Sequence, residues 1–150
     1  MIRFYYEDTL FRIKNPEATA EVVKSVSTDL GLAGLVEVVF CSDRFIEQIN
    51  AQYLNHFYPT DIITFSAGVD FTSPMMYISV DTVLENAKIH QTIFLNELFR
   101  VVVHGLLHLA GYNDLTKEEK TNMRKMENQY LYKYFQLFHV EQLTGNEKLP

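Results

Sequence analysis

Residues 104–114 read His-Gly-Leu-Leu-His-Leu-Ala-Gly-Tyr-Asn-Asp, and this stretch constrains the fold and the chemistry together. His104 and His108 are four residues apart, so a helix places both imidazoles on one face, one turn apart. Gly111 can end that helix in the left-handed conformation, which residues with a β-carbon avoid. The chain can then turn back and bring Asp114 beside the imidazoles. Two imidazoles and a carboxylate, with a fourth position left open, form the ligand set of a hydrolytic metal site.

Two histidines on an apolar helix can equally be core residues with satisfied hydrogen bonds. Buried imidazoles need polar partners, however, and the flanking residues offer none. These flanking residues are Val101, Val102, Val103, Leu106, Leu107 and Leu109. The helix also stops at Gly111, where a third ligand would have to return. The sequence therefore predicts a metal site formed by His104, His108 and Asp114, with buried core histidines as the alternative.

The segment resembles the signature of the YbeY family, which comprises bacterial metal-dependent endoribonucleases that mature ribosomal RNA. The family signature reads His-Gly-x-Leu-His-Leu-x-Gly-Tyr-Asp-His, and it allows every residue of the stretch 104–112. A second family element, Asn-x-x-Tyr followed by Pro-Thr-Asp-Val-Leu-Ser-Phe, is similar to Asn50 and Tyr53 followed by Pro-Thr-Asp-Ile-Ile-Thr-Phe at 59–65. Order and spacing agree, so the resemblance covers nearly the whole chain.

The resemblance implies a metal-dependent endoribonuclease that is specific for single strands, processes the 3′ end of 16S ribosomal RNA and takes part in ribosome quality control. It implies one divalent transition metal ion, with zinc as the expected metal, held by His104, His108 and Asp114. Single-stranded RNA, ribosomal RNA and the small ribosomal subunit are the expected partners. The alternative is a ribosome-assembly binding factor with a structural metal and no catalysis. An open coordination position favours the enzyme, whereas a fourth protein ligand favours the binding factor.

The chain departs from the family pattern at positions that concern the site. Asp114 stands where the pattern has its third histidine, and Asn113 stands where it has aspartate. Leu54 replaces an arginine that usually follows the tyrosine of the second element, and Pro74-Met75 replaces a Gly-Asp pair before the fourth strand. A carboxylate ligand offsets part of the charge of the ion and suits ferrous iron or nickel as well as zinc. Contacts to RNA made by the family arginine do not carry over to Leu54.

Gly105 follows the first histidine, at the position where related zinc proteases have a glutamate general base. Because glycine has no side chain for proton chemistry, a protease mechanism of that kind lacks its base. Phosphodiester cleavage remains suitable, since a metal ion can polarise the phosphoryl oxygen and supply the nucleophile together. Asp61 is the candidate for a base from elsewhere, but a turn at residues 59–61 whose carboxylate caps backbone amides is the favoured interpretation. The sequence therefore assigns no protein base.

Three further histidines, at positions 56, 90 and 139, stand alone in the sequence. We interpret His56, His90 and His139 as surface or packing residues. Any one of them would be a substitute ligand if the Asp114 side chain faced away from the imidazoles.

The length and composition fit one globular domain over residues 1–150, which is 47% hydrophobic. No apolar run approaches the roughly 20 residues that span a bilayer, and residues 1–8 lack the apolar region of a signal peptide. Cys41 is the single cysteine, which excludes an internal disulfide and fits a reducing compartment. We expect Cys41 to be a buried strand residue. The expected location is the cytoplasm, with no membrane partner and no disulfide-linked partner.

The net charge of -6 is unusual for a protein that binds RNA, because such binding draws largely on the neutralisation of phosphates. Basic residues do gather late in the chain, and a solvated helix face explains them as well as a phosphate track does. These residues are Lys117, Lys120, Arg124, Lys125 and Lys133. We therefore expect weak non-specific binding of RNA.

The pattern of apolar and turn-forming residues predicts an α+β fold in which one mixed four-stranded sheet, with one antiparallel strand, packs against about five helices. The histidine helix is expected at the centre of the core. Strands are predicted at 2–7, 35–40, 61–65 and 76–80, and helices at 16–30, from 43 to about 53, after 81, at 93–110 and from 117 to about 139. Ser42 or Asp43 caps the second helix, Asp81 caps the third, and Thr116 with Glu119 forms a capping box for the last. Residues 144–150 are expected to be a frayed tail.

Overall fold

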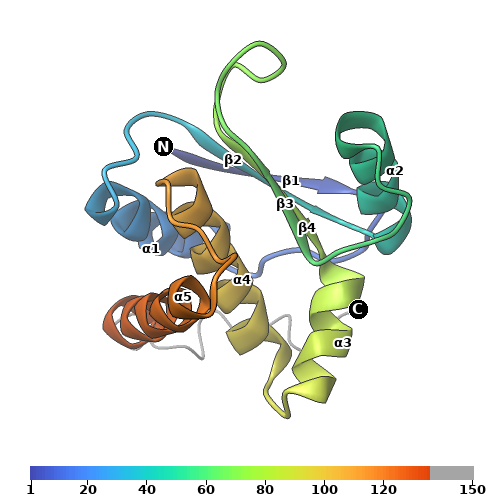
Figure 1. Cartoon of the computed structure of the whole chain (residues 1–150). Helices are drawn as coiled ribbons and strands as arrows, with labels where there is room; N and C mark the ends of the chain where they lie inside the picture. Colours follow the sequence, from blue (N-terminus) through green and yellow to red (C-terminus); the bar gives the residue numbers. More distant parts are fainter. Residues whose placement is uncertain (136–150) are drawn as a thin grey trace.

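The strands form one mixed sheet in the order β1-β2-β4-β3. The computed structural model in Figure 1 shows this sheet with helices on either side of it. Strand β1 pairs parallel to β2, β2 pairs parallel to β4, and β3 pairs antiparallel to β4. In chain order the elements are β1 (Ile2–Glu7), α1 (Pro16–Asp29), β2 (Val36–Cys41), α2 (Asp43–Leu54), β3 (Ile62–Phe65), β4 (Met75–Ser79), α3 (Val80–Ile89), α4 (Phe94–Leu109), α5 (Lys117–Tyr130) and the π-helix η1 (Leu131–Phe135). This architecture confirms the predicted fold class.

The structure describes residues 1–135. Three predictions therefore fall partly or wholly outside the described residues: the last turns of the final helix up to position 139, the surface position of His139, and the frayed tail at 144–150.

The two faces of the sheet are covered by different helices, because successive side chains of a strand point to opposite faces. Val38 and Phe40 of β2 belong to the large core that α1, α3 and α4 complete. On the other face, Cys41 of β2 and Ile63 of β3 pack against α2 in a smaller cluster. Figure 1 shows α2 apart from α1, α4 and α5, in agreement with the two clusters. The helix that carries His104 and His108 therefore lies on the face with the larger core.

Helix α4 lies at the centre of the large core, as predicted for the histidine helix. Eleven of its sixteen residues are buried. A β-carbon at Gly105 would overlap the Met76 sulfur and the Ile62 δ-carbon, so the absence of a side chain lets α4 approach β3 and β4 closely. A glutamate at this position would point into the sheet. The close packing therefore gives a structural reason for the missing protease base.

The helix caps agree with the sequence in two cases and differ in one. The Ser42 hydroxyl accepts a hydrogen bond from the Phe45 amide, and Thr116 and Glu119 form the predicted capping box of α5. The prediction that Asp81 caps α3 is wrong. Ser79 is the cap, since its hydroxyl accepts from the Thr82 amide, and the Asp81 carboxylate instead accepts a hydrogen bond from the Asp43 amide at 2.9 Å. Asp81 thus connects α3 to the start of α2.

Cys41 is fully buried at the end of β2, which confirms its interpretation as a strand residue. Burial, aided by the nearby charges of Asp81 and Asp43, raises the pKa of the Cys41 thiol to about 12. The thiol is therefore protonated at neutral pH, and protonated thiols are poor nucleophiles.

Within residues 1–135, no single helix combines the length and the apolar character needed to cross a membrane. Helices α3 and α4 meet those two criteria only when they are taken together, and they are bent by 115° at the break between them.

Candidate metal centre

The three predicted ligands meet at the C-terminal end of α4. Gly111 adopts a φ of 99°, in the left-handed region that the sequence predicted, and the Tyr112 amide then bonds back to the Leu107 carbonyl at 3.0 Å. This reversal returns the chain over the last turn of the helix. The carboxylate oxygen Oδ2 of Asp114 consequently lies 3.4 Å from Nε2 of His104 and 3.4 Å from Nε2 of His108.

The other ring nitrogen of each histidine has its own partner, and these partners fix the tautomers. Nδ1 of His108 lies 3.0 Å from the Tyr112 carbonyl oxygen, which can only accept. Nδ1 of His104 lies 2.8 Å from Oε2 of Glu127, whose carboxylate is also bound by Arg100. Both Nδ1 atoms therefore donate, and in neutral imidazoles this leaves each Nε2 with a lone pair.

The donor set fits a cation. The two Nε2 atoms lie only 2.9 Å apart with the Asp114 oxygen beside them, so two nitrogen lone pairs and a carboxylate converge on one point. Ligand atoms around one tetrahedral zinc ion at about 2.1 Å are separated by about 3.4 Å, close to the spacing seen here. The side chains of His104, His108 and Asp114 are 25%, 26% and 35% exposed, so the point of convergence opens to solvent.

Glu127 of α5 is the residue that the sequence analysis missed. Its side chain is only 7% exposed, and its two oxygens bind Nδ1 of His104 and Nη1 of Arg100, the latter at 3.0 Å. Burial opposes the charge of this carboxyl group, but the hydrogen bonds from His104 and Arg100 outweigh burial and lower the pKa of Glu127. Burial also opposes the charged form of His104, which by itself would lower the pKa of this histidine. The hydrogen bond to Glu127 and the charge of Glu127 outweigh burial, so the pKa of His104 is raised.

The flanking residues were expected to offer the imidazoles no polar partner, and the side chain that binds His104 indeed lies outside that stretch. The partner of His104 comes from another helix, 23 residues further along the chain. A signal was available, since Glu127 is four residues after the buried Met123 and so falls on the core-facing side of α5. A charged residue at a core-facing position needs a buried partner.

We expect Glu127→Gln to weaken metal binding by roughly 10–100-fold, the usual cost of losing the group that orients a ligating histidine. The amide keeps the shape of the side chain but removes the charge that holds His104 in its donating tautomer. Titration with a competing chelator measures the affinity, and circular dichroism confirms the fold. Glu118→Gln is the matched control, because Glu118 lies exposed in the first turn of the same helix. Equal affinities for the two variants would contradict an orienting role for Glu127.

Two cavities flank the ligands, and Asp61 lines both of them together with His104. One cavity, of about 380 Å³, also contains His108, His56 and Leu54 on its walls. Leu54, at the position where the family pattern has arginine, thus lines a cavity that adjoins the site. The other cavity, of about 270 Å³, is lined by Asp114 and His90.

Two of the histidines that stand alone in the sequence, His56 and His90, have neighbours in space close to the site. The His56 ring stacks on Tyr58, and Nδ1 of His90 lies 3.4 Å from the buried Glu97 carboxylate. Both side chains line cavities that adjoin the site, yet neither belongs to the ligand cluster. Within the described part of the chain, no fourth histidine, cysteine or acidic residue joins His104, His108 and Asp114.

The chain is similar to known endoribonucleases over most of its length. The family model described as "Endoribonuclease YbeY" matches residues 7–135. A protein of that name from Amoebophilus asiaticus is 39% identical over 134 residues, which cover 87% of this chain and 90% of the relative. One from Bacteroides thetaiotaomicron is 42% identical over 121 residues, with 79% of this chain and 88% of the relative covered.

The fold is also found among solved structures. A solution structure of a Thermotoga maritima protein superimposes with a TM-score of 0.69 at 25% sequence identity, and the match covers 94% of this chain and 93% of the other. The extent of the family match and the identity to these relatives confirm the resemblance read from residues 104–114: the chain belongs to the endoribonuclease YbeY family.

Proposed function

We propose that this protein is a metal-dependent endoribonuclease that cuts single-stranded RNA during the maturation of ribosomal RNA, at the 3′ end of the small-subunit RNA. The observation that carries the proposal is the open cluster of His104, His108 and Asp114, which stand at the three histidine positions of the family signature with aspartate in place of the third. The proposed cofactor is one divalent transition metal ion, zinc in the first instance. The proposed partner is the small ribosomal subunit, which makes the cytoplasm the expected place of action.

The residues of the chain orient the two imidazoles and leave the ligand atoms open to solvent. Glu127 and the Tyr112 carbonyl hold the two imidazoles with Nε2 facing the Asp114 carboxylate. When bound there, a metal ion supplies a Lewis acid that stabilises charge on the phosphoryl group and activates water. The cavities on both sides leave room for a phosphodiester with nucleotides before and after it.

The alternative, a ribosome-assembly factor with a structural metal, would favour a closed site with four protein ligands. The described residues contribute three, and all three side chains are partly exposed. The enzyme is therefore the better supported of the two functions.

The test is cleavage of single-stranded RNA by the metal-loaded protein, with and without a chelator, beside a peptide substrate under the same conditions. We expect RNA cleavage that the chelator abolishes and added metal restores, and no peptide hydrolysis, because Gly105 replaces the protease base. We expect weak binding, given the net charge of -6, and we expect the affinity to decrease as the salt concentration rises. Chelator-sensitive proteolysis without RNA cleavage would overturn the proposal.

Asp61 is the candidate general base. Among the described residues, the Thr60 hydroxyl is the single donor to its carboxylate, at 3.4 Å, and no backbone amide donates to it. The interpretation of Asp61 as a cap of its own turn therefore has no hydrogen bond to support it. A partly exposed carboxylate that lines both cavities beside His104 is placed to accept a proton from the attacking water.

We expect Asp61→Asn to retain its metal and to cleave RNA about 100- to 10,000-fold more slowly, the range for removal of a general base. Single-turnover cleavage rates and metal content measure the two properties separately. Asp70→Asn is the matched control, because Asp70 is an exposed loop carboxylate outside the cavities. A variant that cleaves RNA at the wild-type rate would exclude Asp61 as the base.

A further inference from the structure

A third and larger cavity adjoins the two cavities beside the ligands. The cavity that holds Asp114 shares Asp61 and His104 with its neighbour toward α2. On its other side it shares His90, Glu97, Arg100 and Arg124 with a cavity of about 670 Å³ between α4 and the α5–η1 helices. The three cavities therefore adjoin one another through shared wall residues, and this row of cavities, called the groove below, has the candidate metal centre near its middle.

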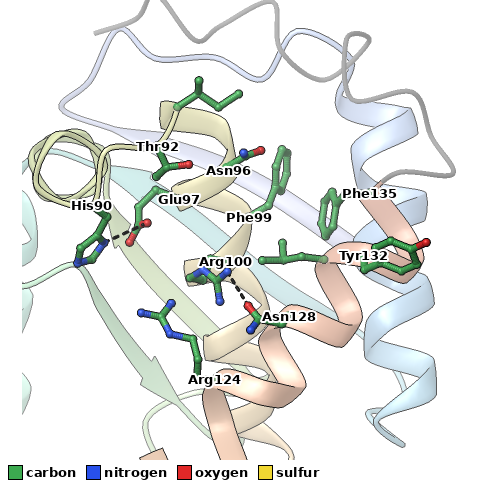
Figure 2. Close-up of a pocket in the computed structure, with 12 residues that line it drawn as sticks. His90, Thr92, Asn96, Glu97, Phe99, Arg100, Arg124, Asn128, Tyr132 and Phe135 are labelled. Atoms are coloured by element: carbon green, nitrogen blue, oxygen red, sulfur yellow. Dashed lines mark hydrogen bonds and ion pairs between the residues drawn. The ribbon is translucent and has the colours of Figure 1, made fainter. Parts of the chain in front are cut away.

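The third cavity has the size and lining of a binding pocket for a small organic group (Figure 2). Phe99 and Phe135 are buried and pack with ring centroids 4.5 Å apart, so they provide an apolar floor. The amide of Asn96 and the guanidinium of Arg124 lie on the walls. Ligand pockets of about 300–1,000 Å³ with an apolar base and a few polar groups suit a nucleotide, which has a flat base and a charged phosphate.

Some basic residues of the C-terminal half line the groove, whereas others are bound elsewhere. Lys120 and Arg124, four residues apart on α5, line the cavity that contains Asp114. Lys120 makes no ion pair within residues 1–135, and the one ion pair of Arg124 there is a long contact of 3.8 Å with Glu127, which already binds Arg100 and His104. Lys133, by contrast, pairs with Asp29 of α1. Two cations beside the metal centre therefore remain available to an anion.

The opposite arm of the groove carries no such charge. The cavity toward α2 is lined by no lysine or arginine among the described residues, and Leu54 is one of its wall residues. Phosphate neutralisation accounts for much of the affinity of a protein for RNA. In this chain, the charges that can supply it lie on the α5 side of the metal centre.

We propose that the RNA strand leaves the metal centre along α5, with Lys120 and Arg124 on its phosphates and a flanking nucleotide bound in the cavity between α4 and α5. This path rests on the proposed endoribonuclease function, and it names the residues of this chain that hold the substrate in place. The Asn96, Arg124 and Asn128 side chains present hydrogen-bonding groups to the nucleotide, while Phe99 and Phe135 lie beneath it.

The charge contacts are tested by the salt dependence of RNA binding. Stopped-flow anisotropy with a labelled single-stranded RNA, recorded on the metal-loaded protein before cleavage sets in, gives the affinity at each salt concentration. For single strands, each lost phosphate contact reduces the slope of log K against log salt by about 0.7. We expect this reduction for Lys120→Gln and for Arg124→Gln. Lys117→Gln and Lys125→Gln, which remove the same charge from exposed positions of α5 outside the groove, should keep the wild-type slope.

The nucleotide pocket is tested by Asn96→Glu, which places a negative charge on its wall. Asn96 is exposed in the first turn of α4, where an acidic residue favours the helix, so the fold should be retained. RNAs lengthened one nucleotide at a time should show a step in affinity with the wild-type protein when the added nucleotide reaches the pocket. We expect the step to disappear in Asn96→Glu and to persist in Gln48→Glu, the same change of charge on an exposed position of α2.

The outcomes separate this path from the proposed function. Wild-type protein that cleaves RNA, with the same salt slope for all four charge variants, would overturn the path along α5 and leave the nuclease function intact. The absence of RNA cleavage, with the loss of slope confined to Lys120→Gln and Arg124→Gln, would support the path and overturn the nuclease function. A step in affinity that persists in Asn96→Glu would overturn the nucleotide pocket.

Discussion

His104→Ala is expected to lose the bound metal ion and to cleave RNA at least about 1,000-fold more slowly than the wild-type protein. His104 supplies one of three converging ligand atoms, and it is also the one held by the buried Glu127 carboxylate. The rate estimate corresponds to several kcal/mol of transition-state stabilisation by a metal ion, at 1.36 kcal/mol for each tenfold change. Elemental analysis of the purified variant gives the metal content, and a cleavage assay with added metal gives the residual activity.

His56→Ala and His90→Ala are the matched controls for this experiment. Both histidines line cavities next to the site, but neither belongs to the ligand cluster, so both variants should retain about one metal ion per chain. Full retention of metal by His104→Ala would refute the assignment of the site. Loss of metal from either control would mean that the ligand set differs from His104, His108 and Asp114.

The elements that the sequence predicted well are those whose signals are local. Gly111 ends α4 in the left-handed conformation, and Thr116 with Glu119 begins α5, because each signal acts within a few residues. The prediction of the residue that caps α3 was wrong because it depends on contacts between elements. Ser79 and Asp81 are both suitable capping residues, and the contact of Asp81 with the Asp43 amide depends on where α2 packs.

The residues of the candidate site also fall into those that local sequence predicted and those that depend on packing between elements. His104, His108 and Asp114 lie within 11 residues, so the helical period and one glycine were enough to predict that they converge. Glu127, Arg100 and the positions of His56 and His90 depend on how separate elements pack, and no short pattern encodes that. The periodicity of α5 indicated that residue 127 faces the core, but not that its partner is a ligand.

Asp114→Asn should lose most of its metal while the protein keeps its stability. A neutral amide oxygen is a poorer ligand for these ions than a carboxylate, so we expect a loss of affinity greater than the roughly 10–100-fold that follows from losing an orienting partner. Asp114→Ala should bind metal as weakly or more weakly, because only the two histidines remain. Asp114→His should retain the metal, since it restores the three-histidine set of the family pattern.

The competing explanation for Asp114 is that it only favours the start of α5 through charge and capping. The structure contradicts a purely capping role, because Thr116 is the residue that caps α5. The Asp114 oxygen instead lies 3.4 Å from the Nε2 atoms of both histidines. If Asp114 served the helix alone, Asp114→Asn would keep its metal, since asparagine caps about as well as aspartate. Metal content and melting temperature of that single variant therefore separate the two roles: loss of metal at an unchanged melting temperature identifies a ligand, and unchanged metal removes Asp114 from the site.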